Sequence, residues 1–523
     1  MLNRVSNSSS DLNIVFRLDS SSVIGFGHLM RSLTLAAEFK QRGANCFFIC
    51  RDLPGNNSSL VIRAGFELLR LPIHHVATTE FGQSDIRHHA WLGTTWLNDI
   101  NQCTPYFRKL KPVLIVVDHY ALGADWETRA KFFCQRLAVI DDLADRRHEC
   151  DFLLDYNLSV SQQDYSSRVE KHCLRLFGGK YVLLRQEFAN WRSQSIARRK
   201  DNTLSRILVT FGATDSDNNS EQVLKVLNAV YLPALTRIDV VISSKAPWLA
   251  SVRAYASTMA VETHLHTDIS NMAELITAAD LAIGSGGGST YERLFLKLPS
   301  LLMPIADNQI TPLQRMSQDG LFELFYTFDE LWQKLMKYHT LPLPKVSASV
   351  LFGAPFVSAL LLAETVTLAD VKPWDVRRNY HWLQQQSLRQ QFVLAAKPER
   401  SNHIKYWRHL LAAPEQYVFS ILSNRCHVGS LGVKNIDEQA KEAEIWIYLG
   451  HSDERNRGVG SKALLLLEEF VKQTLLMQSI VLHVAKDNTH AQSFYYKHHY
   501  RLSNTALPDA FKGKDVLQMR KKL

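Results

Sequence analysis

Two glycines and a histidine stand together near the start of the chain, directly after a short apolar run. Gly25 and Gly27 precede His28, and a stretch with helical periodicity begins at Leu29. Glycines here let the backbone turn tightly beside a ligand, and a helix N-terminus presents N–H groups that attract anions. An imidazole at such a place can accept a proton from water near neutral pH. The motif predicts proton-transfer chemistry beside an anion, while a histidine that only caps a turn is the commoner alternative.

Two further glycine-rich segments follow apolar runs in the middle of the chain, Thr210–Asp215 (TFGATD) and Gly284–Glu292 (GSGGGSTYE). Backbone amides and hydroxyls in such loops can hold a diphosphate, and a carboxylate one turn into the next helix can bind ribose hydroxyls. A tight strand-to-helix connection without a ligand is the alternative. The candidate ligand contacts of this region are Ser289, Thr290, Glu292 and, on the rim after the next strand, Asn308.

Another glycine turn, Arg455–Gly460 (RNRGVG), separates a strand pattern from a long helical pattern. Successive amides at a helix N-terminus can bind a pyrophosphate, and the two arginines add positive charge. The expected contacts are Arg455, Arg457, Gly458, Val459 and Gly460.

Short β-rich apolar runs must position these loops. Through the first two thirds of the chain they alternate with helix-length amphipathic stretches, which is typical of doubly wound α/β domains. A basic, polar stretch over 189–202, a linker or a surface helix, interrupts the pattern before it restarts. The predicted strands are Asn13–Phe16, Cys46–Cys50, Val113–Val117, Leu137–Ile140, Arg206–Thr210, Val240–Ile242, Leu281–Gly284 and Ser300–Pro304.

The character of the chain changes near Lys372–Trp374. Beyond that point we predict strands at Ala443–Tyr448 and Ile480–Ala485 and a helix at Ser461–Gln473. The apolar stretch Val350–Ala363 is too short to span a bilayer, so we expect a buried helix packed on a sheet. The expected organisation is a flexible tail at 1–11, Rossmann-like domains at 12–200 and 201–370, and a further domain at 371–523.

Residues 12–340 resemble the UDP-2,4-diacetamido-2,4,6-trideoxy-β-L-altropyranose hydrolases of pseudaminic acid biosynthesis. The resemblance is carried by Arg17–Arg31, Asp118–Tyr120, Leu183–Phe188, and Gly286–Glu292 with Asn308-Gln309; Ala213 stands where the family often has a second glycine. It implies two Rossmann-like domains in glycosyltransferase-B (GT-B) architecture, similar to the MurG-type transferases, and hydrolysis at the anomeric carbon. His28 matches the family's water-activating base. The implied substrate contacts are Arg17, Tyr120, Arg185, Ser289, Thr290, Glu292 and Asn308.

The glycine turn at Arg455–Gly460 and the segment Asn488–Tyr495 together resemble the GNAT acetyltransferases, in which that turn binds the pyrophosphate of coenzyme A. The resemblance implies an α+β domain, acetyl-CoA as cosubstrate, Asn488 beside the cofactor and Tyr495 as the acid that protonates the leaving thiolate. Glu444 or a relayed water is the candidate base.

The stretch Trp374–Leu411 also resembles the start of the 4-amino-sugar N-acetyltransferases of the same pathway. Their product is the hydrolase substrate, so the sequence predicts a bifunctional enzyme. It would acetylate the 4-amine of UDP-4-amino-4,6-dideoxy-N-acetyl-β-L-altrosamine and then release UDP. A glycosyltransferase with an acetyltransferase tail and a non-catalytic sugar-nucleotide sensor are the alternatives.

Composition narrows the remaining classes. The net charge is +9 over 523 residues without a Lys/Arg run, so we expect anionic small molecules and no nucleic acid as partners. The seven cysteines contain no Cys-x-x-Cys pair, and no residues stand at metal-ligand spacing, so we expect reduced thiols and no metal. The polar N-terminus has no signal-peptide pattern, and we expect a cytoplasmic protein that does not insert into membranes.

Overall fold

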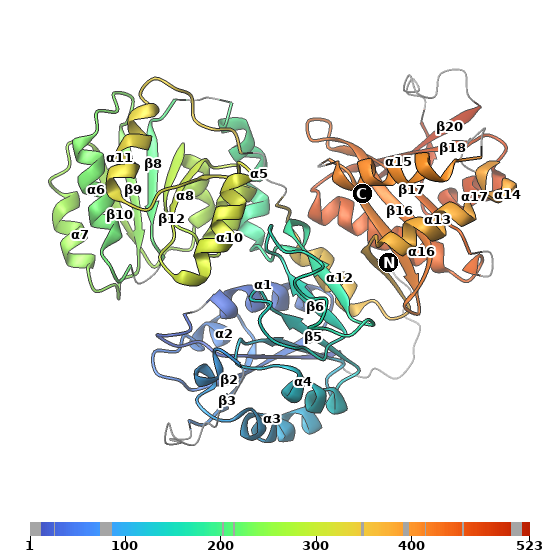
Figure 1. The fold of residues 1–523 in the computed structure, drawn as a ribbon, viewed down its shortest axis with the longest axis horizontal. Coiled ribbons are helices and arrows are strands. Elements are labelled where there is room, and N and C mark those ends of the chain that lie inside the picture. The colour runs from blue at the N-terminus through green and yellow to red at the C-terminus, as the bar shows by residue number, and fades with distance from the viewer. Residues whose placement is uncertain are drawn as a thin grey trace. The chain divides into compact units, whose positions relative to one another are not determined.

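The structure is a computed structural model that describes residues 12–25, 27–73, 86–200, 203–212, 215–346, 350–390, 397–413, 415–451, 454–503 and 515–523. The tail expected at 1–11 lies outside these residues. Contacts divide the chain into two compact units. The first comprises Met1–Tyr156, Ser161–Phe177 and Gly353–Leu523, and the second comprises Asn157–Val160 and Gly178–Phe352 (Figure 1).

The N-terminal part of the first unit contains a parallel seven-stranded sheet in the order β3-β2-β1-β4-β5-β6-β7. The strand order reverses between β1 and β4, and ligands of open α/β sheets bind beside such a reversal. The strands are β1 (Asn13–Leu18), β2 (Asn45–Arg51), β3 (Glu67–Leu71), β4 (Leu114–Asp118), β5 (Arg136–Ile140), β6 (Phe152–Asp155) and β7 (Leu174–Phe177), and the helices are α1 (Gly27–Gln41), α2 (Ser59–Arg63), α3 (Trp96–Leu110) and α4 (Ala124–Ala130).

The second unit contains another parallel sheet, in the order β10-β9-β8-β11-β12-β13, with its reversal between β8 and β11. Its strands are β8 (Arg206–Thr210), β9 (Arg237–Ile242), β10 (Glu262–Thr267), β11 (Leu281–Ser285), β12 (Ser300–Met303) and β13 (Glu323–Leu324). Its helices are α5 (Gln186–Arg198), α6 (Asn219–Ala229), α7 (Leu249–Ala256), α8 (Met272–Ala278), α9 (Ser289–Phe295), α10 (Asp307–Gln318) and α11 (Phe328–Lys337).

The polar stretch over 189–202 mostly forms α5, which packs against α8 and α9. Its Ser195 is fully buried and donates to the carbonyl of Leu296 over 2.6 Å. The helix therefore belongs to the second unit, upstream of the boundary expected at residue 201.

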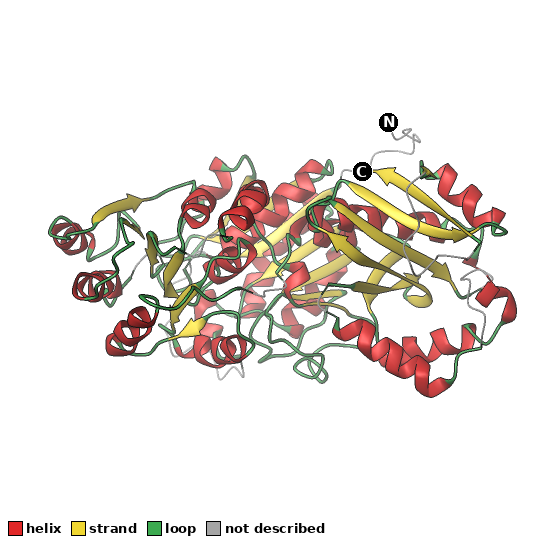
Figure 2. Ribbon diagram, turned by 90° about the horizontal axis from the view of Figure 1, so that it is seen from above, coloured by secondary structure: helices red, strands yellow, loops and turns green. Residues whose placement is uncertain are grey.

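The C-terminal part of the first unit is an α+β domain around a mostly antiparallel sheet in the order β14-β15-β16-β17-β18-β20-β19. Figure 2 shows the long strands of this sheet, with the C-terminus at the end of one of them. The strands are β14 (Val366–Asp370), β15 (Tyr417–Ser423), β16 (Cys426–Asp437), β17 (Glu442–Leu449), β18 (Ser479–Ala485), β19 (Arg501–Leu502) and β20 (Val516–Lys522). The helices are α12 (Ala354–Leu362), α13 (Pro373–Trp382), α14 (Gln386–Gln390), α15 (Arg400–Ala412), α16 (Val459–Glu469), which continues into a π-helical turn (Phe470–Thr474), and α17 (Thr489–Lys497).

Strands β17 and β18 run parallel and are paired only over Glu442–Glu444, although both continue further. Their carboxyl-terminal halves therefore diverge and leave a wedge in the sheet. At the other end of the domain, β14 pairs with β15, so this sheet begins at Val366 rather than after residue 371.

Helix α12 joins the two parts of the first unit. Its side chains from Ala354 to Leu361 are all buried, and it packs between α1 on one side and α16 with the π-helical turn on the other. At its edge, the Arg42 guanidinium donates to Ser358 Oγ over 2.7 Å and pairs with Glu469 of α16. The expected buried helix is present; it packs on helices α1 and α16, and the ring of Phe356 contacts that of Phe419 in strand β15. Among the described residues, no helix has both the length and the apolar character needed to cross a membrane.

Candidate functional sites

The first site lies at the reversal of the N-terminal sheet. His28 is the second residue of α1, directly after the loop that follows β1, and Asp118 ends the neighbouring strand β4. The His28 Nδ1 lies 2.6 Å from Asp118 Oδ1. Gly25 adopts φ +75°, which an L side chain rarely tolerates, and so permits the turn that leads into α1. A proton on Nδ1, donated to Asp118, leaves Nε2 as a proton acceptor.

Arg31, one turn further along α1, fixes the same carboxylate. Its Nε and Nη2 donate to the two oxygens of Asp118 over 2.8 and 2.6 Å. Burial alone would raise the pKa of Asp118, but the charges of Arg31 and His28 outweigh it and hold the pKa well below its ordinary value. Asp118 is therefore a permanent anion that orients His28.

Tyr120 stands beside this pair. Its ring meets the His28 ring edge-on with centroids 4.4 Å apart, and its hydroxyl donates to Asp142, which also accepts from Arg31 over 2.9 Å. Burial, followed by the charge of Asp142, raises the pKa of Tyr120 well above its ordinary value, so the phenol stays protonated. The rings of His88 and Trp91 flank Tyr120. Tyr120, which the family resemblance places near the sugar, therefore lies directly beside His28.

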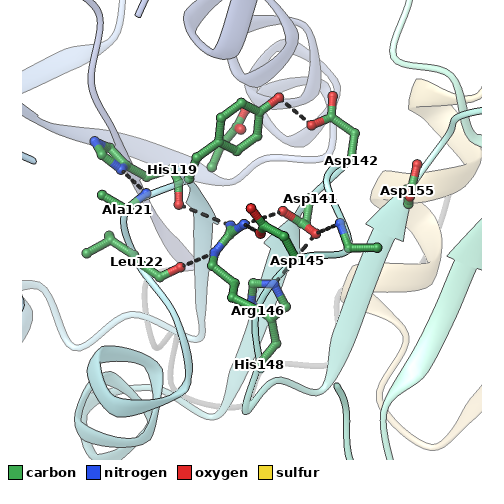
Figure 3. Close-up of polar contacts among 12 residues, drawn as sticks. His119, Ala121, Leu122, Asp141, Asp142, Asp145, Arg146, His148 and Asp155 are labelled. Atoms are coloured by element: carbon green, nitrogen blue, oxygen red, sulfur yellow. Dashed lines mark hydrogen bonds and ion pairs between the residues drawn. The ribbon is translucent and has the colours of Figure 1, made fainter. Parts of the chain in front are cut away.

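A buried ionic layer supports these residues (Figure 3). Arg146 pairs with Asp141 over 2.7 Å and donates to the carbonyls of Leu122 and His119, which flank the Tyr120 loop. His148, also buried, contacts Glu127 at 2.7 Å and Asp141 at 3.7 Å. The layer ties the loop after β4 to the loop after β5.

Arg17 differs from our expectation of a substrate contact. Its side chain is fully buried, and its guanidinium is taken up by Asp19 at 2.6 Å and Asp99 at 2.5 Å. Asp19 also accepts from the Arg51 N–H. Arg17 is therefore paired within the protein, where it stabilises the start of the loop that carries His28.

The second site lies at the reversal of the sheet in the other unit, where the loop Gly284–Gly288 connects β11 to α9. A Cβ on Gly284 would lie 2.0 Å from the Thr210 carbonyl oxygen of β8, so only glycine allows the two strands to meet there. Ser289 is half-buried at the start of α9, and Thr290 is buried. Arg293, almost fully buried, donates to the Ser285 carbonyl over 2.7 Å and to Thr290 Oγ1 over 3.3 Å.

Arg185 and Glu292 contact each other within this unit, with 3.4 Å between Arg185 Nη2 and Glu292 Oε1. Burial raises the pKa of Glu292 despite the charge of Arg185. Asp215 instead caps α6 by accepting from two backbone N–H groups over 2.9 Å each. Asn308 is the second residue of α10, which follows β12, and its side chain lies outside the described residues. The expected residues of this unit therefore follow the carboxyl ends of β11 and β12. Arg185 is the exception, because it lies directly before α5 and reaches the group through Glu292.

The third site surrounds the wedge between β17 and β18. The turn Arg455–Gly458 leads into α16, where Gly458 has φ +79° and open space around its missing Cβ, and the Val459 side chain is buried. Arg457 is exposed, and Arg455 donates to the Leu449 carbonyl over 3.4 Å. Gly460 lies in the first turn of α16, whose N–H groups have no partner within the helix. The turn has the form of a diphosphate cradle.

Asn488 and Tyr495 belong to α17, on the other side of the wedge. Asn488 caps the helix by accepting from the Ala491 N–H over 3.0 Å, so its amide nitrogen is the group left to face a cofactor. Tyr495 is buried, and burial raises the pKa of its phenol well above its ordinary value. The phenol is therefore protonated at neutral pH, as a general acid must be.

Glu444, the candidate base, is buried on β17. It accepts from His483 Nδ1 of β18 over 3.1 Å and from Lys434 and Asn435. Burial would raise the pKa of Glu444, but these donors lower it, so the carboxylate is ionised at neutral pH. A proton taken up from the substrate amine would reach Glu444 through the neighbouring His483 or through a water.

Sequence reasoning missed Arg31, Asp142, Arg293 and His483, which hold the expected residues in place. The position of Arg31 three residues after His28, on the same helix face, was a readable signal. Arg293 stands three residues after Thr290 on α9 and offered the same signal, whereas Asp142 and His483 are placed by strand order, which no local pattern reports. Within the described part of the chain, no group of three or more His, Cys, Asp or Glu could hold a metal ion.

Comparisons with known proteins find both a hydrolase relative and an acetyltransferase family match. Residues 378–500 match the Acetyltransferase (GNAT) family. A UDP-2,4-diacetamido-2,4,6-trideoxy-β-L-altropyranose hydrolase of Campylobacter jejuni is 25% identical over 317 residues, which are 61% of this chain and 100% of the hydrolase. An uncharacterized protein of Methanocaldococcus jannaschii is 22% identical over 299 residues, 56% of this chain and 55% of that protein.

Solved structures of a MurG protein and of an N-acetyltransferase are also similar to this chain, at low sequence identity. MurG of Acinetobacter baumannii aligns with 67% of this chain and 99% of its own, at 14% identity and a TM-score of 0.45. The N-acetyltransferase PseH of Campylobacter jejuni aligns with 30% of this chain and 99% of its own, at 15% identity and a TM-score of 0.23. The chain is an enzyme that combines similarity to a UDP-sugar hydrolase with a segment, residues 378–500, that matches the GNAT acetyltransferase family.

Proposed function

We propose that this chain catalyses two consecutive steps on a UDP-linked amino sugar. The C-terminal domain transfers an acetyl group to the 4-amine of UDP-4-amino-4,6-dideoxy-N-acetyl-β-L-altrosamine, and the rest of the chain hydrolyses the product to UDP and the free diacetamido sugar. The observation that carries the proposal is the pairing of His28 with Asp118 in a region that spans the whole length of a named hydrolase of this substrate. The identity of 25% supports the reaction class, and the experiment below tests the substrate.

In the hydrolytic step, His28 accepts a proton from water through Nε2 while Asp118 and Arg31 hold its ring. The water oxygen attacks the anomeric carbon, and the bond from that carbon to the diphosphate oxygen breaks. Within the second unit, backbone N–H groups of the loop Gly284–Gly288 and of the start of α9 can bind a diphosphate and take up its charge without a metal.

In the acetyl transfer, acetyl-CoA supplies an activated acyl group. The residues fit this cosubstrate: Gly458 leaves its cradle open, Arg455 and Arg457 add positive charge, and the wedge between β17 and β18 opens beside it. Glu444, with His483, draws a proton from the attacking amine, and Tyr495 donates one to the leaving thiolate.

Mass spectrometry of the products from the purified full chain tests both steps. With the UDP-4-amino sugar and acetyl-CoA, we expect UDP, coenzyme A and the diacetamido sugar, while omission of acetyl-CoA should suppress UDP release. In ¹⁸O-water the label should enter the sugar and not UDP, because the carbon–oxygen bond breaks. UDP release only in the presence of a second sugar acceptor would indicate a glycosyltransferase, and binding without any product would indicate a sensor.

A further inference from the structure

A cavity of about 300 Å³ lies within the first unit, outside the three sites described above. It is formed where β7, the edge strand of the N-terminal sheet, adjoins β14, the edge strand of the C-terminal sheet. The walls come from the segment Lys171–Leu174 before β7, from the start of α13, and from the β15–β16 hairpin around Arg425. We call it the seam cavity.

Positive charge dominates the seam cavity. Lys171, Lys372, Arg378 and Arg425 line it, against the carboxylates of Asp370 and Asp375, and Arg425 is itself paired with Asp151 over 2.7 Å. Asp375 is already engaged, because it accepts from the Lys372 N–H over 3.0 Å and from Ser420 Oγ over 2.8 Å. An anion entering the cavity would therefore meet an excess of cations.

Lys372 is the most buried of these four cations. It is half-buried, and among the described residues its ammonium has no hydrogen bond or ion pair, only the ring of Trp374 at 5.3 Å. Burial and then the nearby charge of Arg175 lower the pKa of Lys372. A negative ligand would relieve both effects.

An aromatic face and a buried imidazole complete the lining. Trp374 lines the cavity although 59% of its surface is exposed, so one face of its indole can take a planar ring. His427 is 5% exposed, and its Nδ1 has no hydrogen-bond partner, with Asp375 Oδ1 at 3.3 Å. Cations beside an exposed aromatic ring are the groups that bind the phosphates and the base of a nucleotide.

We propose that the seam cavity binds a nucleoside diphosphate, with the base stacked on Trp374 and the phosphates held by Lys372, Lys171 and Arg378. The ligand is either a free nucleotide or the nucleotide part of a nucleotide sugar. The cavity is built by both parts of the first unit, so its occupant would contact the hydrolase-like region and the acetyltransferase domain at once.

Cys426 provides a local readout of occupancy. It lines the cavity and is exposed, whereas Cys134 is half-buried elsewhere and the other five cysteines are buried. The full chain is treated with iodoacetamide, and alkylation of each cysteine is followed by peptide mass spectrometry. UDP should slow alkylation of Cys426 roughly five-fold at about four times its dissociation constant, while Cys134 is unaffected. Uridine, which lacks phosphates, should not protect.

Variants test whether the named residues cause the protection. Lys372→Glu and Trp374→Ala should each abolish it, and Trp374→Ala removes an exposed side chain, so the fold should survive. Lys405→Glu, the same charge change at an exposed position of α15, should retain full protection. Protection by both UDP and UDP-N-acetylglucosamine identifies a site for nucleotide sugars as well, and protection by UDP alone identifies a site for the free nucleotide.

Three outcomes would overturn the proposal. These are no protection of Cys426 by millimolar UDP, the same protection in Lys372→Glu and Trp374→Ala as in the parent chain, or protection by coenzyme A but not by UDP. The assay needs no turnover, so it fails or succeeds independently of the proposed reactions.

Discussion

The ring of His28 is held from one side by a carboxylate that Arg31 holds in turn. Turning the imidazole would break its 2.6 Å contact with Asp118, a carboxylate whose pKa is held well below its ordinary value by the charges of Arg31 and His28. The tautomer with a free Nε2 is therefore favoured without any substrate present, and the residue is ready to accept a proton.

Replacing His28 by alanine should lower the hydrolytic rate by about 10²- to 10⁴-fold, the usual contribution of a positioned general base, with little change in substrate binding. UDP release from pre-acetylated substrate measures the rate, and calorimetric titration measures binding. His339→Ala, at an exposed histidine of the second unit, is the matched control and should leave both unchanged. A near-normal rate in His28→Ala would transfer the role of base to another group, such as Asp118.

His148 makes stability depend on pH. Burial alone would lower its pKa, but interactions with Glu127 and Asp141 raise it to about 9, above the ordinary value of 6.5. Because the folded pKa is the higher one, the stabilisation is complete below about pH 6.5 and disappears as the pH rises through 9. It amounts to roughly 3 kcal/mol.

The melting temperature should therefore fall between pH 7 and 9.5, and His148→Gln should flatten that fall. His172→Gln, at a half-exposed histidine, is the control and should keep the pH dependence of the parent. An unchanged slope in His148→Gln would show that the buried ion pairs do not set it.

At the scale of elements, strands with continuous apolar runs were predictable, and edge strands were not. β1, β2, β4 and β5 have cores of β-branched and aromatic residues, and the expected strands lie on them. β10 (ETHLHT) is a half-exposed edge strand that lacks a continuous apolar run, and no strand was predicted there. Arg17 shows a different limit of sequence-based prediction. The sequence cannot tell an arginine that binds a ligand from one that is paired with carboxylates of the protein itself, as Arg17 is with Asp19 and Asp99.

Glycine positions differ sharply in the space available to a side chain. Gly284→Ala should push β8 and β11 apart, because its Cβ would lie 2.0 Å from the Thr210 carbonyl oxygen. We expect a loss of about 1–3 kcal/mol of stability and at least tenfold weaker UDP binding to the second unit. Gly287→Ala, whose Cβ meets nothing within 4 Å, is the control and should keep the parental melting temperature. Equal melting temperatures for both variants would contradict the packing argument.

Gly458→Asp should abolish acetyl transfer and spare hydrolysis. The substitution forces an L residue to φ +79° and puts a carboxylate where a diphosphate is expected. Coenzyme A release measures the first activity, and UDP release from pre-acetylated substrate measures the second. Gly320→Asp imposes the same charge at φ +72° in open space of the second unit and controls for backbone strain. Loss of hydrolysis in folded Gly458→Asp would contradict independent chemistry at the two sites.

For the whole molecule, the structure places the boundary of the C-terminal domain earlier in the chain than the sequence predicts. The sequence predicts a break near Val371–Trp374, because a new pattern opens there. β14, however, precedes that point and pairs with β15, and α12 is buried between α1 and α16. Pairing of distant strands depends on the order of the sheet, so the local pattern could not reveal it.

A fragment of residues 372–523 should consequently be unstable. It lacks β14, whose Val366 and Leu368 are buried in the C-terminal sheet. A fragment of residues 364–523 keeps that strand and should show a cooperative melting transition, which circular dichroism would detect. If both fragments melt alike, β14 contributes nothing to the domain, and the boundary expected from the sequence is adequate.

The packing of helix α12 also affects the order in which the chain can fold while it is being synthesised. Its apolar side that finally faces α16 and the π-helical turn leaves the ribosome roughly 100 residues before those segments exist, which at about 5–20 residues per second is on the order of 5–20 s. During that interval α1 can cover only one side of the helix, and the side around Phe356 stays open to water. The apolar side of α12 is therefore covered only once α16 and the π-helical turn have been made, so folding of the N-terminal part is completed by segments of the C-terminal part.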